Sequence, residues 1–155
     1  MNTNRRDFLK ASSVFGLMAA AGLVTMEDAL AQAAGWNKAA FDAKTMAESI
    51  KAMGGAMPTQ SADIAITAPD IAENGAVVPV GVTSKIPDTQ AIYLFVEKNP
   101  SALTAGFNLP AGTEPTVSTR IKMGQTSNVT AVVKADNKYY FTTKEVKVTL
   151  GGCGG

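Results

Sequence analysis

The sequence from residue 61 to residue 150 predicts an all-β domain, an immunoglobulin-like antiparallel β-sandwich of about seven strands. Short runs follow one another in which apolar and polar residues alternate, as they do in half-buried strands. Clusters of Gly, Pro, Asn and Asp separate these runs at a spacing of roughly ten residues, which is typical of sandwiches. The single cysteine excludes the inter-sheet disulfide of antibody domains. A lipocalin-like barrel is the alternative, although the eight or so strands of such a barrel are hard to find.

The strand patterns differ along the chain. Valine alternates with other residues around Pro79, and this proline indicates a sheet edge or a bulge because it has no backbone N–H. The continuous apolar run Ile92–Val96 favours a central strand. Ala135-Asp136-Asn137 predicts a short hairpin between the last two strands. The predicted strands cover residues 63–67, 76–84, 89–98, 102–108, 116–123, 127–134 and 138–150.

One helix is predicted over residues 37–53, ahead of the sandwich. Alanine, isoleucine and methionine recur there at spacings of three and four and form an apolar stripe, and Asn37 can cap the amino end. Gly54-Gly55 ends the helix, and Pro58 prevents it from resuming. We expect the stripe to cover one opening of the sandwich or a partner's surface. The methionines of this segment fit core packing better than a soft-metal site.

Residues 1–33 resemble a twin-arginine (Tat) export signal. The run Asn4-Arg5-Arg6-Asp7-Phe8-Leu9-Lys10 matches the Tat pattern except at Asn4, where the pattern has Ser or Thr. The weakly hydrophobic stretch that follows is too short for a permanent membrane anchor. Small residues offer cleavage sites at Ala31-Gln32-Ala33, which we favour, or at Ala29-Leu30-Ala31. We therefore expect a mature periplasmic domain from residue 34 to residue 150; an uncleaved amphipathic helix is the alternative.

The composition excludes several classes of function. The chain has no histidine and one cysteine, so neither a Ser-His-Asp nor a Cys-His catalytic device can be built. The commonest zinc ligand is missing, and the acidic residues are scattered without a metal-binding cluster. The formal net charge is +1, and Lys and Arg are not clustered after residue 34, so nucleic acid or anionic lipid would find no basic surface. We expect no metal, no cofactor, no nucleic-acid or membrane binding, and no catalytic activity of the chain's own.

The last five residues, Gly151-Gly152-Cys153-Gly154-Gly155, are the candidate functional segment. Glycine has no Cβ and wide conformational freedom, so Gly151, Gly152, Gly154 and Gly155 predict a flexible tether around Cys153. Five extended residues reach at most roughly 17 Å. No basic residue within the tail would activate the thiol, so activation is expected from a protein that receives it. This combination predicts a swinging arm, whereas an incidental cysteine is usually buried.

The run Val146-Lys147-Val148-Thr149-Leu150 followed by this tail resembles the carboxyl end of SoxY, the sulfur-carrying subunit of the periplasmic thiosulfate-oxidising Sox system. The resemblance implies a non-catalytic carrier that holds sulfur intermediates covalently on Cys153. It also implies a heterodimer with SoxZ and transient docking to other Sox proteins. These are the cytochrome SoxAX, which couples thiosulfate to the cysteine, the manganese hydrolase SoxB, which releases sulfate, and in some organisms the sulfane dehydrogenase SoxCD.

Two other functions compete with the carrier. The first is a periplasmic immunoglobulin-like binding or assembly module whose tail only docks on a partner. The second, an independent thiol enzyme, fails because the chain has no general base. The sequence leaves open which sulfur compounds are loaded, whether SoxCD is present, which residues contact partners, and what the resting oligomer is, including dimers joined through Cys153.

Overall fold

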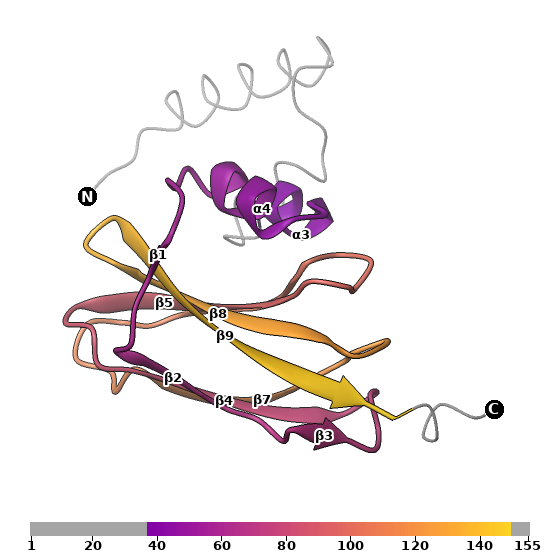
Figure 1. Cartoon of the computed structure of the whole chain (residues 1–155). Helices are drawn as coiled ribbons and strands as arrows, with labels where there is room; N and C mark the ends of the chain where they lie inside the picture. Colours follow the sequence, from indigo (N-terminus) through magenta and orange to yellow (C-terminus); the bar gives the residue numbers. More distant parts are fainter. Residues whose placement is uncertain (1–36, 150–155) are drawn as a thin grey trace, which may run out of the picture. The chain divides into compact units, whose positions relative to one another are not determined.

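The computed structural model describes residues 37–149 (Figure 1). The chain divides into two units, Met1–Lys38 and Ala39–Gly155, and nearly all described residues belong to the second. The predicted export signal (residues 1–33) and the predicted tether with Cys153 lie outside the described residues. The elements of the described part are α3 (Lys38–Asp42), α4 (Met46–Ala52), β1 (Thr59–Gln60), β2 (Ile64–Thr67), β3 (Ile71–Ala72), β4 (Val78–Ser84), β5 (Thr89–Val96), β6 (Leu103–Asn108), β7 (Thr116–Ile121), β8 (Ser127–Ala135) and β9 (Lys138–Val148).

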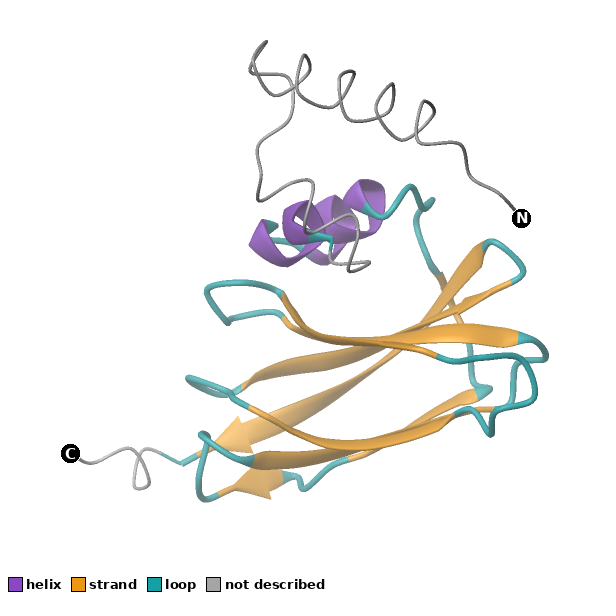
Figure 2. Cartoon of the chain, turned by 180° about the vertical axis from the view of Figure 1, so that it is seen from behind, coloured by secondary structure: helices purple, strands orange, loops and turns teal. Residues whose placement is uncertain are grey.

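The strands form two sheets that face each other (Figure 2). The larger sheet has the order β1-β9-β8-β5-β6, with β3 also paired to β9, and the smaller sheet has the order β2-β4-β7. Every pairing is antiparallel except those of β1 and β3, which run parallel to β9. The predicted immunoglobulin-like all-β sandwich is therefore confirmed. The sequence pattern misses β1 and β3 because strands of two residues show no periodicity.

The hydrophobic core fills the space between the two sheets. In β5, which lies between β8 and β6 as a central strand, Ile92, Leu94 and Val96 are fully buried. Burial of each such side chain stabilises the fold by about 1.5–3 kcal/mol. The predicted role of Pro79 also fits, because β2 pairs with β4 only from Gly81 to Ser84 and leaves that edge of β4 unpaired at the proline.

Two short helices stand where one helix over residues 37–53 was predicted. α3 ends at Asp42, and α4 begins after Thr45. The Thr45 hydroxyl accepts a hydrogen bond from the Glu48 N–H at 3.2 Å, and the Glu48 carboxylate accepts one from the Thr45 N–H at 3.2 Å. This capping box starts a new helix. The single-helix prediction is wrong at this point because the apolar spacing continues across the break.

The helices cover the outer face of the larger sheet, whereas an opening of the sandwich or a partner's surface was predicted (Figure 1). Ala40 of α3 and Ile50 of α4 belong to a second apolar cluster. Its members on the sheet side are Phe95, Ala102, Leu103, Val132 and Tyr139. The two helices therefore shield the aromatic side chains on the outer face of the larger sheet from water. Neither described helix has the length and apolar character needed to cross a membrane.

The β8–β9 hairpin sets the direction in which the chain leaves the sandwich. The two strands pair without interruption from Ala135↔Lys138 to Ser127↔Val146. Asp136 and Asn137 form the turn with φ angles of 49° and 58°, the left-handed conformation that two-residue hairpin turns require. The predicted hairpin is confirmed. Because β9 runs from this turn to Val148, the chain leaves the sheet at the opposite end of the sandwich.

Candidate functional site at the end of strand β9

Hydrogen bonds hold the last residues of β9 on both sides. On one side the Val148 N–H donates to the Thr126 hydroxyl oxygen at 2.9 Å, one residue before β8 begins. On the other side the Thr149 N–H donates to the carbonyl oxygen of Ala72 in β3 at 3.1 Å. A threonine side chain therefore extends the ladder on one edge, and a two-residue strand extends it on the other. The backbone is held in this way up to Thr149, the last described residue.

Lys144 fastens the segment that leads into β3. Its ammonium group donates to the Ala68 carbonyl oxygen at 2.6 Å and lies 3.0 Å from the Asp70 carboxylate. The Lys147 N–H of the same strand donates to the Asp70 carbonyl oxygen at 3.0 Å. In the β8–β9 register Lys144 lies opposite Val129, a core residue. A charged residue at an inward position of a strand is the sequence signal that could have identified it.

The turn between β3 and β4 packs against the same strand end. The Val77 N–H donates to the Asn74 carbonyl oxygen at 3.3 Å, and the Met123 N–H donates to the Gly75 carbonyl oxygen at 2.7 Å. Gly75 is buried, and a Cβ at this position would collide with the Met123 carbonyl oxygen and lie 2.9 Å from Val148 Cγ1. The turn can approach β9 this closely only because residue 75 has no side chain.

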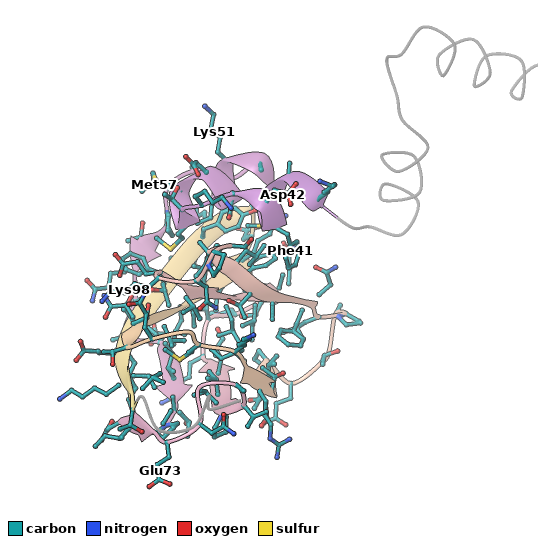
Figure 3. The ribbon with its side chains drawn as sticks, turned by 90° about the vertical axis from the view of Figure 1, so that its right-hand side faces the viewer. Phe41, Asp42, Lys51, Met57, Glu73 and Lys98 are labelled. Atoms are coloured by element: carbon teal, nitrogen blue, oxygen red, sulfur yellow. The ribbon has the colours of Figure 1, made fainter. Side chains whose placement is uncertain are left out.

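The remaining loops at this end are joined to one another. The Asn99 side-chain amide donates to the Lys122 carbonyl oxygen at 2.7 Å, and the Gly124 N–H donates to the Asn99 side-chain oxygen at 3.3 Å. The Lys98 N–H donates to the Ser127 hydroxyl oxygen at 3.1 Å. Figure 3 looks onto this end of the sandwich. The hydrogen bonds connect the β5–β6 and β7–β8 loops into a continuous support beside the end of β9.

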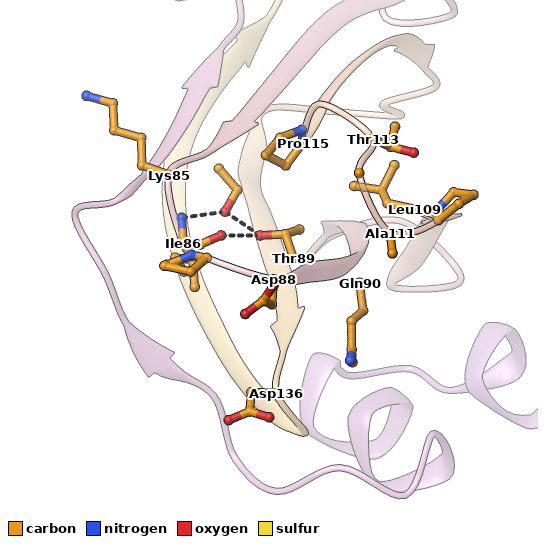
Figure 4. A pocket seen from close by; sticks show the side chains of 14 residues that line it. Lys85, Ile86, Asp88, Thr89, Gln90, Leu109, Ala111, Thr113, Pro115 and Asp136 are labelled. Atoms are coloured by element: carbon orange, nitrogen blue, oxygen red, sulfur yellow. Dashed lines mark hydrogen bonds between the residues drawn. The ribbon is translucent and has the colours of Figure 1, made fainter.

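A cavity of about 740 Å³ lies at the other end of the sandwich (Figure 4). The β4–β5 loop, the β6–β7 loop and Asp136 of the hairpin turn line it. The Ser84 and Thr89 hydroxyl oxygens are 2.9 Å apart, and the Thr89 hydroxyl donates to the Ile86 carbonyl oxygen at 2.8 Å. These polar groups satisfy one another. A smaller cavity of about 360 Å³ lies between Thr45 and the outer face of the larger sheet.

In the described part of the chain, two tyrosines have a pKa that departs from its ordinary value: Tyr139, which is buried, and Tyr93, which is half-buried. Desolvation by burial raises the pKa of Tyr139 above its ordinary value of 10.0. Desolvation likewise raises the pKa of Tyr93, with a smaller contribution from the negative charge that Tyr139 would carry. Both lie in the layer beneath the helices. Within residues 37–149 no group of three or more acidic or cysteine side chains gathers as a metal site would require.

None of the predicted site residues lies in the described part of the structure, which ends at Thr149, two residues before the predicted tether. Cys153 and the glycines Gly151, Gly152, Gly154 and Gly155 lie outside the described residues. Arg120 is exposed on β7. Thr126, Lys144 and Gly75 were not predicted. Their contacts depend on strand pairing between distant parts of the chain, and only Lys144 carries a local signal.

Comparison with known proteins places this architecture in a family. The family model described as "Sulfur oxidation protein SoxY" matches residues 50–153, more than half of the chain, and its range includes Cys153. The solved structure of the sulfur carrier protein SoxY from Chlorobium limicola f thiosulfatophilum is 43% identical, with a TM-score of 0.59 over 65% of this chain and 93% of that chain. The comparison with curated proteins finds no match. The chain therefore belongs to the SoxY family, and its role is that of a carrier in sulfur oxidation.

Proposed function

We propose that the chain holds sulfur intermediates of thiosulfate oxidation covalently on Cys153 and presents them to Sox enzymes. The observation that carries this proposal is the match of the SoxY family model through residue 153, the position of the chain's single cysteine. The hydrogen bonds at Val148 and Thr149 support it, because they give the tail a defined starting point.

Loading and unloading involve the thiol and no other group of this chain. Thiosulfate and the thiol lose two electrons and one proton together, and a sulfur–sulfur bond forms to give a cysteine S-thiosulfonate. A SoxAX-type cytochrome would accept the two electrons. Water then attacks the terminal sulfonate sulfur, which leaves as sulfate with release of a proton, and a persulfide remains on Cys153. A SoxB-type hydrolase would catalyse this step, so the carrier is the substrate of both enzymes.

The distance that the thiol can travel is limited by the covalent chain. Four peptide units link the Cα atoms of Thr149 and Cys153, which corresponds to at most about 14 Å when extended. The chain would form a heterodimer with a SoxZ-like subunit, and this heterodimer would present the Cys153 thiol to several enzymes in turn. The twin-arginine pattern in residues 1–33 supports export of this pair to the periplasm in a folded state, and SoxCD would be a further client where it is present.

The test is intact-mass analysis of the protein purified from thiosulfate-grown cells, with and without reductant. We expect added mass that matches thiosulfate-derived groups, localised to the tail peptide and removed by the reductant. Cys153→Ser should keep its fold and its partner subunit and lose all thiosulfate oxidation. A Cys153→Ser variant that still supports oxidation would show that the tail only docks on a partner, and the carrier role would then be wrong. A thiol found always bare, or joined only to glutathione, would also contradict the proposal.

A further inference from the structure

The turn between β3 and β4 contains the one asparagine of the sequence that is followed by glycine. Asn74 is exposed and Gly75 is buried. Figure 3 shows the preceding residue, Glu73, at the outer edge of the molecule. In an asparagine–glycine pair the backbone nitrogen of the glycine can attack the side-chain amide of the asparagine, because glycine has no Cβ to shield that nitrogen. The turn is therefore a candidate site of spontaneous covalent modification.

The hydrogen bonds of the turn bring the reacting groups together. The Asn74 side-chain oxygen accepts a hydrogen bond from the Ala76 N–H at 2.9 Å. This bond closes an Asx turn, which folds the side-chain amide back over the next peptide unit, the one that contains the Gly75 nitrogen. Within residues 37–149 no acceptor takes a hydrogen bond from the Gly75 N–H. The nucleophile is therefore not engaged elsewhere, and the amide that it attacks is held beside it.

The Ala76 N–H also points at the atom on which negative charge develops. Attack on the Asn74 side-chain carbon converts the side-chain oxygen into an oxyanion. A hydrogen-bond donor that is already aimed at this oxygen stabilises the tetrahedral intermediate. The amide nitrogen that must leave belongs to an exposed residue, so ammonia can pass directly into the solvent.

We propose that Asn74 is a site of spontaneous deamidation and that its isoaspartate product loosens the support of the end of β9. A base removes the Gly75 N–H proton, the nitrogen bonds to the Asn74 side-chain carbon, and the amide nitrogen takes up a proton and leaves as ammonia. Water then opens the resulting cyclic imide at either carbonyl group. One opening gives aspartate on an unchanged backbone. The other gives isoaspartate, in which the main chain runs through the former side chain.

The fold has no room for isoaspartate at this position. Isoaspartate adds one carbon atom to the main chain, whereas a single Cβ at Gly75 would already collide with the Met123 carbonyl oxygen and lie 2.9 Å from Val148 Cγ1. The Val77 N–H donates to the Asn74 carbonyl oxygen at 3.3 Å, and the Met123 N–H donates to the Gly75 carbonyl oxygen at 2.7 Å. The first acceptor becomes part of a free carboxylate, and the second moves with Gly75. Aspartate leaves the main chain and both hydrogen bonds in place.

The test follows the full chain during several days at mildly alkaline pH. Mass analysis of tryptic peptides measures the loss of amide at each asparagine, and labelling by an isoaspartate-specific methyltransferase measures isoaspartate. We expect conversion at Asn74 to exceed that at Asn108, Asn128 and Asn137 by about tenfold or more, because none of these is followed by glycine.

The stability of the isoaspartate form, after chromatographic separation, measures the effect on the end of β9. Loss of the two hydrogen bonds should lower its unfolding midpoint by about 4–12 °C. The Met123 amide should exchange hydrogen about fivefold faster. Asn74→Asp is the matched control for the added negative charge and should unfold at the midpoint of the fresh wild type. Asn74→Ser has a hydroxyl that can accept from the same backbone N–H, and it should keep its midpoint after the same incubation.

Each contrary result overturns a defined part of the proposal. Conversion at Asn74 no greater than at the other asparagines, or without isoaspartate, would overturn the modification site. Isoaspartate at Asn74 with an unchanged midpoint would overturn the effect on β9. An equal fall in the midpoint of Asn74→Asp would assign the effect to charge, and an equal fall for incubated Asn74→Ser would assign it to damage elsewhere. Either result would overturn the role of the lengthened main chain, and none of them bears on the carrier function of Cys153.

Discussion

Replacement of Gly75 by alanine tests whether the β3–β4 turn supports the end of β9. A Cβ at residue 75 would lie 2.9 Å from Val148 Cγ1 and collide with the Met123 carbonyl oxygen. The turn must then move, which also stretches the 2.7 Å hydrogen bond from the Met123 N–H to the Gly75 carbonyl oxygen. Gly81 offers the matched control in β4, because a Cβ there would find its nearest atom, Thr67 Cβ, at 3.5 Å.

The magnitude follows from three contributions. Overpacking a close contact costs about 1–3 kcal/mol, and loss of the hydrogen bond costs about 0.5–1.5 kcal/mol. Alanine restricts the unfolded chain more than glycine does, which offsets about 0.4–1 kcal/mol. We expect Gly75→Ala to lower the free energy of unfolding by about 0.5–4 kcal/mol. Gly81→Ala should leave the stability unchanged or raise it slightly.

The assay is urea and thermal unfolding followed by circular dichroism on the full chain. At about 4 °C per kcal/mol for a domain of this size, Gly75→Ala should unfold about 2–16 °C below the wild type. The m-value should not change, since both variants expose the same surface when they unfold. Equal midpoints for Gly75→Ala and Gly81→Ala would refute the close packing of the turn on the end of β9.

Three further predictions concern the contacts around β9. Lys144→Met should lower the free energy of unfolding by about 1 kcal/mol in urea titrations, because the Ala68 carbonyl oxygen and the exposed Asp70 carboxylate lose their common partner. The control is Lys147→Met, which should have no effect because the Lys147 side chain is exposed. Thr126→Val keeps the side-chain shape but removes the acceptor for the Val148 N–H, so the Val148 amide should exchange hydrogen about fivefold faster by NMR; unchanged exchange would contradict the contact. Burial raises the pKa of Tyr139 above 10.0, so its contribution to stability is complete below pH 10.0 and declines as the pH rises toward the folded-state pKa. Tyr139→Phe should therefore reduce the loss of stability above pH 10.0 in unfolding curves measured at several pH values.

The sandwich and most of its strands could be predicted from local sequence patterns. Side-chain alternation around Val80 and the continuous apolar run around Leu94 are local records of which faces of a strand are buried, and so both strands were recognised without knowledge of their partners. The position of the single cysteine within four glycines is equally local. The break between α3 and α4 also has a local sequence signal, the Thr45–Glu48 capping box. The prediction missed it because the apolar stripe continues through the break.

The contacts that hold the end of β9, by contrast, could not be predicted from the sequence. Lys144 and Ala68 are 76 residues apart, and Thr126 and Val148 are 22 residues apart, so neither contact follows from any local pattern. The parallel pairing of β3 with β9 brings Ile71 beside Lys147, and the buried Gly75 lets the next turn close against Val148. Strand pairing over such separations depends on the packing of the whole core, because two residues of β3 carry too little periodicity to specify a partner.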